Sequence, residues 1–380
     1  MTGLDLTGKT ALVTGGGTGI GLMIAKAFCD HGAKVYITGR RLEVLEATAN
    51  RLNNERLVPL QMNIVNKDSI RNAVKVVDQN DGKLDILVNN AGILGQYFPY
   101  ISDETAPEHE KMGDFLFEQG SFESWSEVLQ TNTVAPYFVT MAFLTLLQRG
   151  AQSRPGETSS VISISSAGAS MKLSNNNFTY PVSKAGTTYL STLLATEFAI
   201  HKIPVRVNCI EPGIFPSELM SGTPEEIANL MQKPAPGAFS ATPLLRAGKD
   251  EEIATMAVFL ASSAGGFTTG AVMRIDGGLS LVNPPPSSIC VSSSTSTMTS
   301  TSNPASASSP GLVTTPIADA KVSTNTNGIV ATDASPGDAG GDGDGDAGGD
   351  GDAHGDARGH GDRGDADSAA VGSAVVETVE

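Results

Sequence analysis

The chain has 380 residues and a formal net charge of −16, and 40% of its residues are hydrophobic. Residues 284–380 carry 14 acidic and 3 basic side chains, net −11, which leaves −5 for residues 1–283. Acidic surfaces repel phosphate backbones, which argues against nucleic acid as a partner. No apolar run is long enough to cross a bilayer, and no signal peptide precedes the first strand pattern. We therefore expect a cytoplasmic protein without a membrane partner.

The composition changes abruptly at Pro284. From there the chain is rich in Ser, Thr and Pro, and between Gly337 and Asp367 it contains only Gly, Asp, Ala, His and Arg. With nothing larger than alanine to bury, that stretch cannot offset the entropy cost of becoming ordered. The sequence therefore predicts one globular domain over 1–283 and a disordered tail over 284–380.

No pattern in the sequence predicts a metal site. Cys29, Cys209 and Cys290 are scattered without metal-ligand spacing, which suits a reducing compartment. The Asp-Gly run in the tail resembles calcium-binding repeats only in composition, since those repeats need a large apolar residue to build a core.

Seven short β-rich runs recur in the first part of the chain, and apolar helical periodicity fills most of the gaps. The runs cover residues 10–15, 34–39, 57–63, 84–92, 160–166, 204–213 and 271–278. Such alternation predicts an α/β fold of the Rossmann type, a doubly wound, seven-stranded parallel sheet with helices on both faces. Ligands of these sheets bind beyond the carboxyl ends of the strands.

A glycine-rich turn, Thr-Gly-Gly-Gly-Thr-Gly-Ile-Gly over 14–21, follows the first run and opens a helical pattern. Glycines let the backbone approach a pyrophosphate, and a helix start offers free N–H groups and a positive dipole end. We therefore predict dinucleotide binding here; a tight turn without a ligand is the alternative. The predicted contacts are Gly15, Gly17, Thr18, Gly19, Ile20 and Gly21.

Tyr180 and Lys184 are spaced to lie on one face of a helix. Pro181 is tolerated only in a first helical turn, which predicts that Tyr180 lies at a helix start. Tyrosine titrates near pH ~10, and a nearby ammonium that favours the phenolate can bring it into working range. Ser166 closes a strand run and offers a hydroxyl to a carbonyl oxygen. Together these residues predict protonation of a carbonyl while another group delivers hydride.

Several motifs resemble, in order and spacing, the short-chain dehydrogenase/reductase family in its compact single-domain form. They are the T-G-x-x-x-G-x-G turn, Asn-Asn-Ala-Gly at 89–92, Asn132, Ser166, Tyr180-x-x-x-Lys184 and Pro212-Gly213. The match covers residues 5–283. It implies an oxidoreductase that interconverts a ketone and a secondary alcohol with a nicotinamide cofactor.

The resemblance implies four catalytic residues. Tyr180 would donate the proton, Ser166 would hold the carbonyl oxygen, and Lys184 would lower the tyrosine pKa and orient the nicotinamide ribose. Asn132 would hold a water between the substrate site and the lysine, with an ordinary helix cap as the alternative.

Cofactor preference depends on the end of the second run, where the family selects NAD with an acidic side chain. This chain has Gly39 followed by Arg40 and Arg41. Because a guanidinium can bind a 2′-phosphate bidentately, we predict NADP(H) over NAD(H), with Arg40 as the contact; a solvated helix-start arginine is the alternative. The other contacts that the resemblance implies are Asn63, Asn90, Ala91, Gly92, Tyr180, Lys184, Pro212, Gly213, Ile214 and Ser217.

Residues 93–131 form a long segment rich in aromatic side chains, which predicts a wall for a bulky apolar substrate. The wall would consist of Phe98, Tyr100, Phe115, Phe117, Trp125, Met171, Leu173, Phe215, Leu219 and Met220. Packing against the sheet is the alternative for any one aromatic. The run Glu-Pro-Gly-Ile-Phe-Pro-Ser resembles 3-oxoacyl-carrier-protein reductases and similar enzymes of secondary metabolism. This favours an acyl, polyketide-like or ring ketone over a sugar.

Two other classes of protein stay open: a cofactor-binding regulatory or interaction protein without turnover, and an isomerase or dehydratase on the same scaffold. The intact Asn132, Ser166, Tyr180 and Lys184 argue against the first, because a protein without turnover has no physical need for all four.

Ser183 to His201 and the helix after Asn132 match surfaces that the family uses for assembly. We therefore expect a homodimer or homotetramer.

Overall fold

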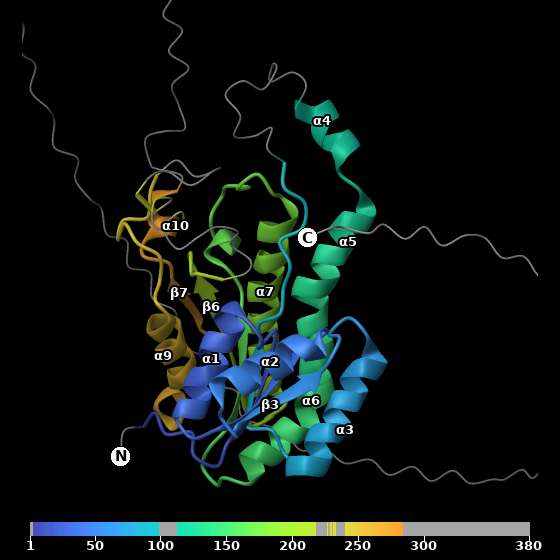
Figure 1. Ribbon diagram of the computed structural model, residues 1–380, viewed down its shortest axis with the longest axis vertical. Coiled ribbons are helices and arrows are strands. Elements are labelled where there is room, and N and C mark those ends of the chain that lie inside the picture. The colour runs from blue at the N-terminus through green and yellow to red at the C-terminus, as the bar shows by residue number, and fades with distance from the viewer. Residues whose placement is uncertain are drawn as a thin grey trace, which may run out of the picture. The chain divides into compact units, whose positions relative to one another are not determined.

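A seven-stranded parallel sheet in the order β3-β2-β1-β4-β5-β6-β7 forms the centre of the protein (Figure 1). The structure is a computed structural model that describes residues 3–98, 112–217, 226, 229, 231–232 and 240–283. The strands are β1 (Thr10–Thr14), β2 (Lys34–Gly39), β3 (Leu57–Gln61), β4 (Ile86–Asn89), β5 (Ser159–Ile164), β6 (Val205–Pro212) and β7 (Val272–Ile275). The predicted fold class is thus confirmed, with every predicted run holding one strand.

Helices cover both faces of the sheet (Figure 1). One layer contains α1 (Gly19–Asp30), α2 (Leu42–Leu52) and α9 (Asp250–Ala261), and the other contains α3 (Lys67–Asp81), α6 (Ala135–Gln152) and α7 (Thr179–Ile200). The remaining elements are α4 (Met112–Gln119), α5 (Phe122–Leu129), the π-helical turn η3 (Gln130–Val134), the 3₁₀ turns η4 (Ala167–Ala169) and η5 (Ser263–Gly265), and α10 (Leu279–Val282).

Successive side chains of the central strands serve opposite layers. Ala11 and Val13 of β1 join the apolar core under α1 and α9, whereas Leu12 between them joins the core under α3, α6 and α7. All five residues of β1 are buried. A strand covered on both faces therefore needs a continuous apolar run rather than an alternating one, which is how the runs appear in the sequence.

The order of the strands creates the place for a ligand. From β1 the chain adds β2 and β3 on one side and then returns to pair β4 with the other side of β1. The connections after β1 and β4 therefore diverge to opposite faces and leave a crevice beyond the carboxyl ends of these two strands.

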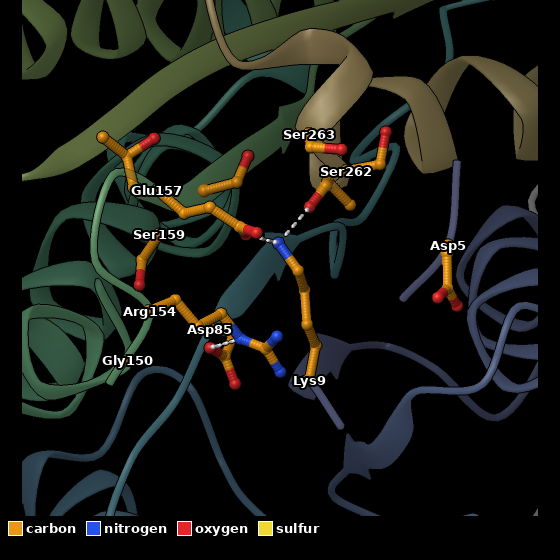
Figure 2. Close-up of polar contacts among 12 residues, drawn as sticks. Asp5, Lys9, Asp85, Gly150, Arg154, Glu157, Ser159, Ser262 and Ser263 are labelled. Atoms are coloured by element: carbon orange, nitrogen blue, oxygen red, sulfur yellow. Dashed lines mark hydrogen bonds and ion pairs between the residues drawn. The ribbon is translucent and has the colours of Figure 1, made fainter. Parts of the chain in front are cut away.

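A network of charged side chains around the buried Asp85 and Lys9 lies at the opposite, amino-terminal edge of the sheet (Figure 2). The side chain of Asp85, 3% exposed, pairs with Lys83 at 3.0 Å and with Arg154 at 3.3 Å. The Asp85 carboxylate also accepts a hydrogen bond from a main-chain N–H of β1 at 2.8 Å. Lys9 pairs with Glu157 nearby at 2.9 Å. The network joins β1 and β4 to the segment between α6 and β5.

Replacing Asp85 with alanine is expected to lower the free energy of unfolding by about 3 kcal/mol, because breaking a buried pair leaves uncompensated charge. Asp78→Ala is the matched control, since Asp78 pairs with Arg149 at 2.7 Å but the two side chains are 47% and 48% exposed. That control should lose no more than about 1 kcal/mol. Urea denaturation measures both, and equal losses would contradict the importance of the buried network.

Some predictions concern residues outside the described part of the chain. They include the disordered tail over 284–380, together with Tyr100, Leu219 and Met220, all of which stay predictions.

Among the described residues, no helix is both long and apolar enough to cross a membrane. The same residues contain no cluster of His, Cys, Asp and Glu that could hold a metal ion.

Candidate active site

A cavity of about 430 Å³ opens beyond the carboxyl ends of the central strands. It brings most of the predicted site residues together. Those that line it are Gly15, Gly17, Thr18, Gly19, Ile20, Arg40, Asn63, Asn90, Ala91, Gly92, Tyr180, Lys184 and Ser217. The predicted residues that do not line it are Gly21, Asn132, Ser166, Pro212, Gly213 and Ile214.

The glycine turn suits a pyrophosphate because Gly15, Gly17 and Gly19 line the cavity without side chains that would keep a ligand from the backbone. Gly15 and Gly19 have positive φ angles of 62° and 51°, which favour glycine. The first turn of α1 holds no acidic side chain that would oppose an anion at its positive end. Gly21 does not line the cavity but packs against the turn: a Cβ there would lie 2.2 Å from the carbonyl oxygen of Gly15. Gly21 thus permits close packing of α1 on the turn.

Asn90 holds the same turn in place. Its Nδ2 donates to the carbonyl oxygens of Thr14 at 2.9 Å and Gly15 at 3.1 Å. Both amide protons are therefore used within the protein, and Oδ1 is the side-chain atom left for a ligand. The residue predicted as a direct cofactor contact has a structural role as well.

The far end of the cavity is polar and basic. Arg40 and Arg41 line it at the start of α2, and both are exposed. Thr38 Oγ1 is fully buried and has no hydrogen-bond partner among the described residues, although Thr38 lines the cavity. Buried hydroxyls are normally paired, so this orphan suits a polar ligand. Glu127 is the one acidic residue among the described residues that line the cavity, and it comes from α5 rather than β2.

Tyr180 lies in the first turn of α7, as Pro181 predicts. Its main-chain N–H donates to Asn177 Oδ1 at 3.0 Å, which satisfies one of the free backbone donors at this helix start. Burial raises the pKa of Tyr180 above its ordinary value, and a side-chain hydrogen bond with Ser166 acts in the opposite direction. The phenol therefore stays protonated at neutral pH, as a proton donor must.

Lys184 is buried one turn further along the same face of α7. Its Nζ donates to the carbonyl oxygen of Ile164 at 2.9 Å and lies 5.7 Å from the centre of the Tyr180 ring. Burial lowers the pKa of Lys184 to about 8. Burial is the larger influence on the Tyr180 pKa, and the predicted lowering of that pKa by Lys184 stays a prediction.

Asn132 lies in η3 and is only 1% exposed. Its Nδ2 donates to the Ile93 carbonyl oxygen and to Ser183 Oγ, both at 2.9 Å, and its Oδ1 accepts from the Ile93 N–H at 2.8 Å. These bonds link the segment after β4 to α7 and leave no helix-cap role for the side chain. The predicted water relay stays a prediction.

Gly92 explains how Asn132 and Lys184 approach one another. A Cβ on Gly92 would lie 3.0 Å from Asn132 Oδ1 and 3.3 Å from Lys184 Nζ. Both polar groups therefore occupy the space that a side chain would take. A side chain at the last glycine of the Asn-Asn-Ala-Gly run would therefore crowd both polar groups, which the sequence pattern alone did not indicate.

Ser166 and the residues after β6 lie beside the cavity. Ser166 starts η4, where its Oγ accepts from the Gly168 N–H at 3.1 Å. Gly213 packs against the end of β7, since a Cβ would lie 2.6 Å from Asp276 Cα. Ile214 packs with Met171 and a neighbouring cluster. These positions therefore shape the loop, and direct cofactor contacts by Gly213 and Ile214 stay predictions.

The predicted aromatic wall is only partly assembled among the described residues. Of the predicted wall, Met171 and Leu173 belong to one apolar cluster with Ala167, the residue that follows Ser166. Phe215, however, belongs to the core under α1 and α9, and Phe117 is 81% exposed on α4. A sequence gives the apolar character of these side chains but not the tertiary surface that each one faces.

Sequence reasoning missed cavity residues that belong to no motif. They are Thr38, Val44, Leu45, Met62, Ile64, Val65, Ile93, Glu127, Thr131, Ile164 and Ser165. Many of them are next to a predicted residue at the end of a strand. The positions of the strand ends in the sequence could therefore have predicted them.

The doubly wound sheet, the glycine turn and the cavity at the switch point define the class of Rossmann-type dinucleotide-binding proteins. Residues 15–280 match the family model described as enoyl-(acyl carrier protein) reductase. The short-chain dehydrogenase/reductase VdtF of Byssochlamys spectabilis is 37% identical over 304 residues, covering 75% of this chain and 96% of that protein. A rhamnolipids biosynthesis 3-oxoacyl-[acyl-carrier-protein] reductase of Pseudomonas aeruginosa is 34% identical, covering 73% and 98%.

Solved structures agree with the sequence relatives. The Pseudomonas aeruginosa RhlG/NADP active-site complex has a TM-score of 0.62 at 30% identity and covers 73% of this chain and 99% of the other. A short-chain type dehydrogenase/reductase from Mycobacterium marinum has a TM-score of 0.59 at 26% identity, covering 73% and 97%. This chain belongs to the short-chain dehydrogenase/reductase family of oxidoreductases, which use a nicotinamide cofactor.

Proposed function

We propose that the protein is an NADP(H)-dependent oxidoreductase that reduces a bulky apolar ketone to a secondary alcohol. The observation that carries this proposal is the position of Tyr180 and Lys184. Both line the cavity that also contains the glycine turn and two arginines. A protonated phenol beside Ser166 suits the transfer of a proton to a carbonyl oxygen.

The chain's own residues perform the proton chemistry in this proposal. Ser166 donates a hydrogen bond that holds the carbonyl oxygen, and Tyr180 transfers its proton to that oxygen. A nicotinamide held in the cavity beside Tyr180 and Lys184 would supply the hydride that the carbonyl carbon accepts. Lys184 carries its positive charge below its pKa of about 8 and stabilises the tyrosinate that remains. As the pH rises through 8, this stabilisation is lost.

Arg40 and Arg41 support NADP(H) over NAD(H), because two guanidinium groups at the start of α2 match an additional phosphate. No acidic side chain of β2 is among the described residues lining the cavity. The similarity to the RhlG/NADP complex points the same way.

Replacing Arg40 with alanine is expected to lower the NADPH-to-NADH ratio of kcat/KM by about tenfold or more, because a charge-assisted hydrogen bond contributes ~1.5–3 kcal/mol. Steady-state kinetics with both cofactors and a bulky ketone measure the ratio. Arg51→Ala, at the other end of α2 and outside the cavity lining, is the matched control. If Arg40→Ala and the double variant with Arg41→Ala both keep the wild-type ratio, the NADP assignment is wrong.

The substrate class is supported by two features. Relatives are named 3-oxoacyl-[acyl-carrier-protein] reductases, which favours an acyl or polyketide-like ketone of secondary metabolism. Met171, Leu173 and Ile214 form an apolar patch beside Ser166 that suits a large apolar substrate.

We also propose a cytoplasmic homo-oligomer, for which the exposed Tyr189 and Leu193 on α7 offer an apolar surface.

A further inference from the structure

Glu211 is a buried carboxylate that the proposed reaction does not use. It lies in β6 and its side chain is 1% exposed, opposite Arg274 of β7 in the sheet register. Arg274 Nη2 and Nε donate to Glu211 Oε2 at 3.0 and 3.2 Å. The main-chain ladder already joins the two strands, and a buried ion pair is often no more stabilising than an apolar pair. Strand pairing therefore does not account for a buried carboxylate here.

The other partners of Glu211 belong to the two elements that carry the proposed catalytic residues. Oε2 accepts from Ser170 Oγ at 2.8 Å, and Oε1 accepts from Thr188 Oγ1 at 3.0 Å. Ser170 directly follows η4, the turn that Ser166 begins. Thr188 lies on α7, one turn beyond Lys184 and two turns beyond Tyr180, on the same face. One carboxylate thus bridges the serine turn and the tyrosine helix.

A second set of contacts extends the bridge to the lysine. Ser165 Oγ lies 2.8 Å from Thr188 Oγ1 and 2.8 Å from the carbonyl oxygen of Lys184, and its single proton is donated to one of these two oxygens at a time. Ser165 lines the cavity and directly precedes Ser166. The polar contacts around Glu211 therefore extend to Ser165, whose hydroxyl is also within hydrogen-bond distance of the Lys184 backbone.

We infer that Glu211 is a positioning residue: through Ser170 and Thr188 it holds the Ser166 turn against α7, so that serine and tyrosine meet the same carbonyl oxygen. This inference rests on the proposed function. Arg274 neutralises the carboxylate and leaves it fixed at the junction of β6, β7, η4 and α7. Breaking either link frees the turn from the helix, and breaking both has little further effect.

Ser170→Ala, Thr188→Val and their combination test the bridge. Each single variant is expected to lower kcat by about tenfold and to leave KM and Kd for NADPH unchanged. A loss of this size corresponds to one hydrogen bond to a charged group. The double variant should lose little more than the worse single variant, because both changes break one bridge. Thr196→Val, an exposed threonine of α7, is the matched control and should keep the wild-type kcat.

Three results would overturn the inference. Unchanged kcat in both single variants would do so, as would losses that multiply in the double variant. The third is a rise in the KM for NADPH together with a lower unfolding midpoint, which would indicate that Glu211 has only a structural role. Ser170 is exposed, so its variant should fold even if Thr188→Val does not. Absence of turnover in the wild type would instead contradict the proposed function.

Discussion

Replacing Tyr180 with phenylalanine is expected to lower kcat for ketone reduction by at least ~100-fold, because a positioned general acid contributes about 10²–10⁴-fold. The phenyl ring keeps the volume of the side chain in the first turn of α7 and removes only the proton donor. The NADPH dissociation constant should therefore stay nearly unchanged. Steady-state turnover and a fluorescence titration with NADPH measure the two quantities.

Tyr189→Phe is the matched control for this substitution. It lies on the same helix, is 66% exposed, and takes no part in the cavity lining. This variant should keep the wild-type kcat. Strong residual turnover in Tyr180→Phe would refute the assignment of Tyr180 as the acid, whatever the control does.

Replacing Gly21 with alanine is expected to weaken NADPH binding by about tenfold to a hundredfold, since overpacking a close contact costs ~1–3 kcal/mol. The added methyl would lie 2.2 Å from the Gly15 carbonyl oxygen and 2.5 Å from Asn90 Nδ2. The first contact is with backbone, so α1 and the glycine turn must separate. Because Asn90 bonds to Gly15, its place in the cavity would move as well.

Gly113→Ala in α4 controls for the general effect of alanine in a helix. No described heavy atom lies within 4 Å of a Cβ built there, so the change should leave NADPH binding intact. It should also stabilise the helix by up to ~1 kcal/mol. Calorimetric titration compares the two variants, and wild-type affinity in Gly21→Ala would show that the turn tolerates displacement.

The strands were predictable because the helices bury both faces of the sheet. Each apolar run had to be continuous, as β1 shows with five buried residues. Strand ends were less predictable: residues 84–92 contain only Ile86–Asn89 as β4, because Asn90 to Gly92 leave the sheet to line the cavity. The π-helical turn at Asn132 has no local sequence signature, and the bonds of this residue to Ile93 and Ser183 join segments far apart in the sequence.

Site residues were predictable where one element fixes their spacing. Tyr180 and Lys184 are an example, since the helical repeat alone places them on one face. Phe215 shows the opposite case: its apolar character predicted a substrate contact, but it packs in the core, where a Cβ on Gly248 would lie 2.3 Å from its ring. The role of Glu211 could not be predicted from the sequence, because its partners Ser170, Thr188 and Arg274 come from three separate elements.

In the proposed reaction, hydride passes from NADPH to a ketone carbon while the protein protonates the oxygen. The most direct test incubates the purified chain with NADPH deuterated at C4 and a panel of bulky acyl, polyketide-like and ring ketones, followed by mass spectrometry. We predict an alcohol with deuterium on the carbinol carbon, formed in equal amount to oxidised cofactor. Bound but unconsumed NADPH across the panel would indicate a binding protein, and product without net cofactor oxidation would indicate an isomerase or dehydratase; either result would contradict the account.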